Sequence, residues 1–239
     1  MSREWLAIAE KVESVSPGIM KALFLCLMLA ALPAFGEHRE NPLAPIALYT
    51  QFEREPPPAV FDALQHEVDS LMAASGLRFT WRDLRAARGD SVSVELAVIS
   101  FKGRCDVAGL SPHGSNAGPL GWTHISDGAI LPFADIDCQG IRSFIQKQLL
   151  AVPVESREEA YGRALGRVLA HELYHIFAKT TRHGAGGAGK SKYTVQDLLS
   201  TDFQFDACES LALKTSEAHA ALERASLLNG ATASIGEHL

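Results

Sequence analysis

The segment 171-HELYH-175 places two histidines four residues apart, with a glutamate directly after the first. On a helix, residues four apart lie on the same face, so His171 and His175 can both reach one metal ion. Glu172 is turned away from this pair around the helix axis and would flank the ion. There it can take a proton from a zinc-bound water. The motif predicts a catalytic zinc site; the alternative is two helix histidines that form local hydrogen bonds.

A catalytic zinc ion usually has three protein ligands and one open position. We expect His183 to be the third ligand, since it lies eight residues beyond His175. The helix must end between them, and Thr180 and Thr181 are poor helix formers. Gly184 permits the sharp turn that must follow. The alternative third ligands lie further downstream and are Asp197, Asp202, Glu209 and His219.

The stretch 166-GRVLAHELYHIFAKTTRHGAGGAGK-190 resembles exported zinc peptidases of soil bacteria, whose site is HExxH followed by seven residues and a third histidine. The resemblance implies that His171, His175 and His183 bind Zn²⁺ and that Glu172 is the general base. It extends loosely into 193–211 and hardly at all upstream. The motif is also similar to that of metzincins, in which five residues rather than seven precede the third histidine.

One residue type expected from this resemblance is missing. Zincins with a Met-turn have a methionine below the metal, whereas this chain has Gly189 at the matching position and no methionine after Met72. Leu198 or Leu199 could supply an apolar floor instead, and Tyr193 could stabilise an oxyanion or simply pack. Two functions therefore remain open: a zinc metalloendopeptidase acting on peptides or proteins, or a catalytically inactive zinc protein with a binding role.

Hydrophobic periodicity predicts the elements that must position these residues. Strands are expected at 45–52, 77–84, 92–101, 119–126 and 129–137. Helices are expected at 59–75, 141–152, 157–179, 194–200 and 205–229, with a loose tail from Gly230. This order is similar to zincins, which implies an α+β fold with a small mixed sheet, a long active-site helix and a helical C-terminal subdomain.

Two local features of this fold bear on the site. Ser156 and Glu159 have the spacing of a capping box, which predicts the start of the long helix. The segment 119–126 is expected either as an edge strand that holds an extended peptide by backbone pairing or as a plain surface loop. His124 within it is expected to be a surface residue rather than a metal ligand.

The segment 20–36 has a basic start, a short apolar run and small residues at its end, as a signal peptide does. We expect export to the periplasm or medium after cleavage near Gly36, so that 1–36 is an extension plus signal and 37–239 is the peptidase domain. The segment 1–19 precedes this signal, so Met20 is the expected true start. The alternatives are a buried core helix or a retained membrane anchor, and only the anchor would give membrane contact.

The charge and the cysteine content bear on binding partners and on the redox environment. The net charge is −6 and no long basic run is present, so a nucleic-acid partner is not expected. After cleavage three cysteines remain, and an exported protein can keep a disulfide. We favour the pair Cys105–Cys138 over other pairings with Cys208, or over three free thiols. No feature of the sequence predicts an oligomeric state.

Overall fold

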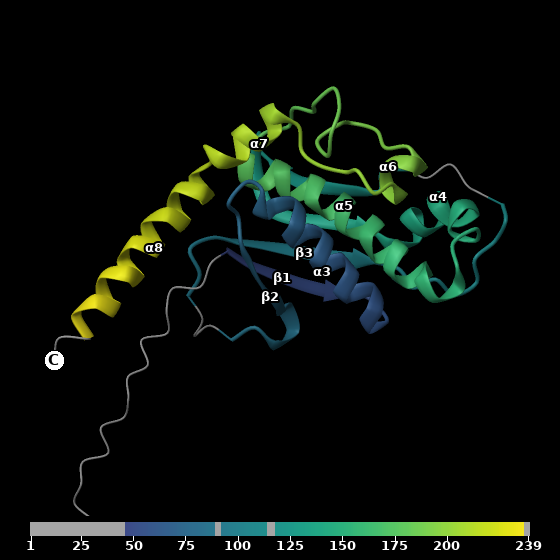
Figure 1. Ribbon diagram of the computed structural model, residues 1–239, viewed down its shortest axis with the longest axis horizontal. Coiled ribbons are helices and arrows are strands. Elements are labelled where there is room, and N and C mark those ends of the chain that lie inside the picture. Colours follow the sequence, from purple (N-terminus) through teal and green to yellow (C-terminus); the bar gives the residue numbers. More distant parts are fainter. Residues whose placement is uncertain (1–45, 89–91, 114–117, 237–239) are drawn as a thin grey trace, which may run out of the picture. The chain divides into compact units, whose positions relative to one another are not determined.

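A computed structural model describes residues 46–88, 92–113 and 118–236 of the chain (Figure 1). The expected signal segment 20–36 lies outside the described residues. The strands are β1 (Ile46–Phe52), β2 (Phe79–Asp83), β3 (Leu96–Lys102), β4 (Gly121–Ser126) and β5 (Ala129–Asp137). The helices before the histidine motif are α3 (Pro58–Ala73), α4 (Cys138–Leu149) and the 3₁₀ turns η1 (Leu84–Ala86) and η2 (Val154–Ser156). The expected strand at 92–101 begins later, at Leu96.

The strands form one mixed sheet in the order β2-β1-β3-β5-β4. β1 pairs in parallel with β2 and β3, and β3 pairs in parallel with β5. β4 pairs antiparallel with β5, from Gly121 opposite Ile136 to Ser126 opposite Ala129. Asp127 and Gly128 join these two strands with positive φ angles of 50° and 77°, as a tight two-residue hairpin turn requires. The segment 121–126 is therefore an edge strand, and the surface-loop alternative is wrong.

Helix α5 (Arg157–Ala178) carries the histidine motif and packs against α3, β4 and β5. Figure 1 shows α3 and α5 side by side across the sheet. Two glycines of α5 allow their backbones to approach closely. A methyl group at Gly162 would lie 2.4 Å from Val60 O, and one at Gly166 would lie 2.9 Å from Leu64 O. Their spacing of four residues puts both on the face toward α3.

Helix α5 is buried on nearly all sides, which hydrophobic periodicity along the sequence does not predict. Every residue from Ala164 to Phe177 is buried, including the histidine motif itself. The buried guanidinium of Arg167 is satisfied by Glu67 Oε1 at 2.7 Å and by the carbonyl oxygens of Asp197 and Ser200. Burial of a charged group without such partners would be costly. Helix α5 is therefore held on one side by α3 and on another by the segment that follows the site.

The capping box expected at Ser156 is wrong. Ser156 precedes α5 with φ −103° and ψ 1°, and its side chain makes no capping hydrogen bond. The turn η2 occupies 154–156 and leads into the helix directly, so Ser156 does not adopt the extended backbone that an N-cap serine needs. The start of the helix was nevertheless located correctly, at Arg157.

Three helices follow the site: α6 (Val195–Leu199), α7 (Ala207–Lys214) and α8 (Glu217–Gly236). The single helix expected at 205–229 is wrong, because the chain breaks at Thr215 and Ser216 between α7 and α8. The loose tail expected from Gly230 is also wrong, since α8 continues to Gly236. Taken together, a mixed sheet with a helical C-terminal part agrees with the expected α+β class.

A disulfide joins Cys105, in the loop after β3, to Cys138 at the start of α4. The favoured pairing is therefore confirmed, and Cys208 is a free, exposed thiol. Within the described ranges, none of the helices has the length and apolar character needed to cross a membrane.

Candidate metal centre

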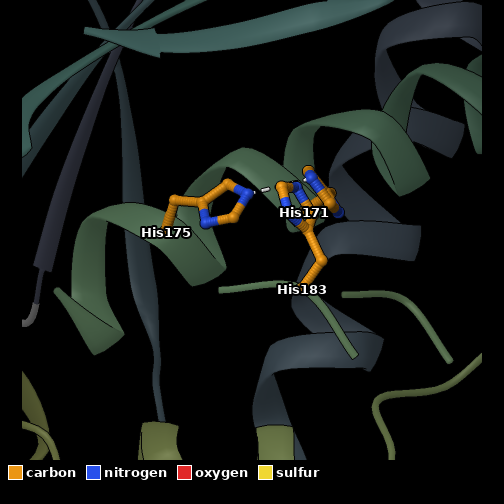
Figure 2. Close-up of side chains that lie close together, drawn as sticks. All are labelled: His171, His175 and His183. Atoms are coloured by element: carbon orange, nitrogen blue, oxygen red, sulfur yellow. Dashed lines mark hydrogen bonds between the residues drawn. The ribbon is translucent and has the colours of Figure 1, made fainter. Parts of the chain in front are cut away.

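The three histidines of the expected site lie together. His171 and His175 project from successive turns of α5, which ends at Ala178. Lys179 then takes a left-handed conformation with φ 49°, and the chain turns back so that His183 reaches the other two. One ligand nitrogen from each ring lies within 4.8 Å of the others. Figure 2 shows the His175 ring pointing toward His171. The expected helix end between His175 and His183 is confirmed.

The outer nitrogens of the two helix histidines are fixed by backbone carbonyls. His171 Nδ1 lies 2.8 Å from Ala188 O, and His175 Nδ1 lies 2.7 Å from Thr180 O. A carbonyl oxygen only accepts, so each Nδ1 must carry the proton. In a neutral imidazole the other nitrogen, Nε2, then carries no proton and presents a lone pair. This arrangement is the one seen in metal-binding histidines, whose second ring nitrogen donates to a carbonyl or carboxylate.

These two lone pairs face each other at close range. His171 Nε2 and His175 Nε2 are 3.0 Å apart, and burial lowers the pKa of both rings, that of His171 to about 4. Because neither ring readily takes a second proton at neutral pH, two acceptors would repel each other unless a cation lies between them. Two nitrogens bound to one tetrahedral zinc ion are about 3.3 Å apart. The donor set therefore fits a zinc ion, with His183 as the third imidazole.

Glu172 lies beside the histidines and is held by the edge strand. Thr123 Oγ1 in β4 donates to Glu172 Oε2 at 2.8 Å and lies 3.2 Å from the Glu172 backbone oxygen. Gly121, two residues earlier in β4, leaves room for the side chain, since a methyl group there would lie 3.0 Å from Glu172 Oε1. Burial raises the pKa of Glu172 to about 7, and the Thr123 hydrogen bonds only partly offset this. A carboxyl with this pKa can both accept and return a proton near neutral pH.

The opposite pKa shifts of Glu172 and His171 predict a distinctive pH dependence of the metal-stripped protein. Between pH 4.5 and 7, Glu172 is protonated when folded and ionised when unfolded, so acidification stabilises the fold through this group. His171 acts in the opposite direction as the pH falls from 6.5 to about 4. In Glu172→Gln only the histidine effect remains.

We therefore expect wild type to gain stability relative to Glu172→Gln as the pH falls from 7.5 to 4.5. The gain should reach at most about 3 kcal/mol, since each pKa unit corresponds to about 1.4 kcal/mol. Urea unfolding of both chelator-treated proteins across this range measures it. A difference between the two that does not change with pH would mean that the carboxyl ionises normally in the folded chain.

The segment after His183 forms the floor of the site. The Tyr193 ring centroid lies 5.6 Å from that of His171, and the Tyr193 hydroxyl donates to Ala188 O, which also accepts from His171. Burial raises the pKa of Tyr193 well above its ordinary value, so the hydroxyl keeps this proton. Leu198 is fully buried and Leu199 partly buried in the core. Tyr193 therefore packs on the His171 ring, and its hydroxyl is engaged by Ala188 O.

Of the four alternative third ligands, Asp197, Glu209 and His219 have other partners, and none of the four, Asp202 included, joins the histidine group. Asp197 caps α6 and pairs with Lys190 at 2.6 Å, and Glu209 caps α7. His219 lies 3.8 Å from Glu223, and His124 lies 2.8 Å from Asp135 Oδ2. Across the described part of the chain, His171, His175 and His183 form the one group of three or more side chains that could hold a metal ion.

A cavity of about 600 Å³ opens over the histidines and Glu172. One side is formed by β4 and by apolar residues of β5, α4 and α5. The other side is formed by the segment after His183, which includes Lys192 and Tyr193. The apolar wall includes Leu120, Trp122, Ile125, Ile130, Phe144 and Val168.

Sequence reasoning missed several residues that complete the site. Thr123 is one, because its link to Glu172 depends on a strand 49 residues away. The carbonyl oxygens of Thr180 and Ala188 are others, since any residue type can provide a carbonyl and no pattern marks it. The glycines at 184–189 were the available signal, because such a run indicates close approach of the backbone to another group.

Comparison with known proteins adds no family to these observations. A scan against models of protein families gave no match for the chain, and a search of the curated proteins gave none either.

Proposed function

We propose that the chain is a zinc-dependent metallopeptidase with a zincin-like fold. The observation that carries this is the pair of Nε2 lone pairs of His171 and His175, held 3.0 Å apart by carbonyl partners on the opposite ring nitrogens. Three imidazoles with an open fourth position are the ligand set of a catalytic zinc ion. When bound, zinc supplies Lewis acidity, which lowers the pKa of water at the site and polarises a carbonyl group.

Glu172 is the general base in this proposal. Its carboxylate takes a proton from the attacking water and later gives it to the leaving amine. Thr123 fixes the carboxyl by donating to Oε2, so that the group is oriented before substrate arrives. The pKa of about 7, raised by burial, suits both proton transfers near neutral pH.

The free edge of β4 supports an extended peptide as substrate. β4 ends the sheet and pairs on its other side with β5, so its outer backbone groups can pair with a further strand. Both Gly121 and Thr123 of this strand line the cavity that holds Glu172. The apolar wall of the cavity favours a substrate with an apolar side chain next to the cleaved bond.

The order of elements supports the zincin-like assignment. Parallel strands come first, an antiparallel edge strand borders the site, and one long helix carries both HExxH histidines. We place the activity outside the cytoplasm. The sequence of 20–36 supports export, and the disulfide Cys105–Cys138 supports an oxidising compartment.

Cleavage of a peptide library by the purified domain tests this function. We expect chelator-sensitive cleavage that returns on addition of zinc, with a preference for apolar side chains at one position beside the cut. Peptides can be separated and sequenced by mass spectrometry. A protein that binds zinc at the three histidines but cleaves no peptide would be the inactive binding protein instead.

A further inference from the structure

The side chain of Glu209 is buried to a degree that its capping role does not explain. Glu209 lies in the first turn of α7 and is 2 % exposed. Its Oε2 accepts from Asp206 N at 2.9 Å, and Asp206 Oδ1 accepts from Glu209 N at 2.8 Å. A capping box of this kind works equally well at the surface. Burying a carboxylate is costly, so its surroundings must compensate for the loss of solvent.

Three glycines of the loop after His183 surround this carboxylate. A methyl group would lie 2.2 Å from Glu209 Oε1 at Gly184, 2.3 Å from it at Gly189, and 2.8 Å from Oε2 at Gly187. Gly186 in the same loop would meet nothing within 4 Å. Burial raises the pKa of Glu209, and the backbone amides of Asp206 and Gly189 offset this only in part. Three of the four glycines therefore leave room for one carboxylate.

The same loop holds the carbonyl that orients His171. Ala188 lies between Gly187 and Gly189 and is fully buried. Its amide donates to Gln204 O at 2.9 Å, and its oxygen accepts from His171 Nδ1 at 2.8 Å. The amide of Gly184 donates to Gly189 O at 3.0 Å and closes the loop. A displacement of the loop backbone at Gly189 would therefore move the Ala188 carbonyl.

We propose, on the basis of the peptidase function above, that Glu209 is a positioning residue for the metal centre. Its carboxylate fills the loop 184–190 and fixes the Ala188 carbonyl against His171. This contact sets which nitrogen of His171 faces the metal.

Two glycine variants give a matched test. Gly189→Ala is expected to weaken zinc binding about 10- to 100-fold, as loss of support for a metal-bound histidine does. Gly186→Ala, in the same loop, should change the dissociation constant less than about twofold, since its methyl meets no atom. Competition with a chromophoric chelator measures both constants on protein that circular dichroism shows to be folded.

Glu209→Ala tests the same contact without adding atoms and should also weaken zinc binding. It removes the atoms that the new methyl at Gly189 would strike. The fold loss of zinc affinity in the double variant Gly189→Ala/Glu209→Ala should therefore be smaller than the product of the two single losses. Tyr161→Phe is the control for stability alone. Tyr161 also lies on α5, and this change removes the hydrogen bond that its hydroxyl donates to Cys138 O. It should leave zinc affinity unchanged.

The outcomes separate this inference from the proposed function. Folded Gly189→Ala and Glu209→Ala proteins that bind zinc as tightly as wild type would overturn the positioning role and leave the function intact. A wild-type protein that binds no zinc would overturn the function. A third outcome is weakened zinc binding in Gly189→Ala and Glu209→Ala, but not in Gly186→Ala, together with no peptide cleavage by wild type. It would support the positioning role of Glu209 and refute the peptidase function.

Discussion

Glu172→Gln is expected to lower kcat/KM for peptide cleavage by about 10²- to 10⁴-fold, the usual contribution of a general acid-base group. The amide has the shape of the carboxylate but cannot take a proton from water. Its oxygen can still accept the hydrogen bond from Thr123, so the side chain should keep its place. Steady-state cleavage of the best library peptide measures the loss, and zinc content should stay at the wild-type level.

Glu159→Gln is the matched control for this variant. Glu159 is an exposed glutamate in the first turn of the same helix, twelve residues before His171. We expect its cleavage rate to remain within about twofold of wild type, since surface substitutions away from special features have small effects. Cleavage by Glu172→Gln at a rate near that of wild type would mean that another group removes the proton.

His183→Ala is expected to weaken zinc binding by more than about 100-fold, because even the loss of a group that only supports a ligand costs 10- to 100-fold. His171 and His175 would remain, held by α5 and by their carbonyl partners. Two imidazoles leave the ion with two open positions, and cleavage should be lost at low free zinc. Chelator competition gives the dissociation constant, and added zinc should restore cleavage only partly.

His66→Ala serves as the control for this change. His66 is an exposed histidine on α3 and does not line the cavity. Its replacement removes an imidazole of the same kind and should leave both zinc affinity and cleavage unchanged. An unaltered zinc affinity in His183→Ala would point to a different third ligand or to a site built from two histidines.

The histidine motif could be predicted from the sequence because it depends on local geometry. A spacing of four residues places His171 and His175 on one face of any helix. The end of the helix before His183 followed from residues that are poor helix formers. The disulfide Cys105–Cys138 was the favoured pairing, and the structure confirms it. The helix motif and the helix end are each determined by a few neighbouring residues, whereas the disulfide joins cysteines 33 residues apart.

The remaining features depend on contacts between distant segments. The hydrogen bond from Thr123 to Glu172 requires that β4 pair with β5 and lie along α5. The burial of α5 on nearly all sides requires α3 and the segment after the site, which hydrophobic periodicity alone does not reveal. The close approach of the Glu209 carboxylate to Gly184 and Gly189 joins two segments that no local pattern connects, whereas Gly187 also needs its positive φ angle of 67°.

Helix boundaries after the site were the least predictable part of the fold. The break at Thr215 and Ser216 separates α7 from α8 without any proline or glycine. Instead, the His219 amide donates a hydrogen bond to the Ser216 hydroxyl, and a new helix starts at Glu217. A hydroxyl residue that caps a helix is hard to distinguish in sequence from one inside it, because serine tolerates both positions.

X-ray absorption at the zinc edge of the wild-type protein, loaded with one equivalent of zinc and dialysed, tests the central claim most directly. We expect one retained ion per chain, bound by three imidazole nitrogens at about 2.0–2.1 Å and one oxygen. A protein that loses its zinc on dialysis, or a bound ion whose shell lacks three imidazoles, would contradict the convergence of His171, His175 and His183 on one metal ion.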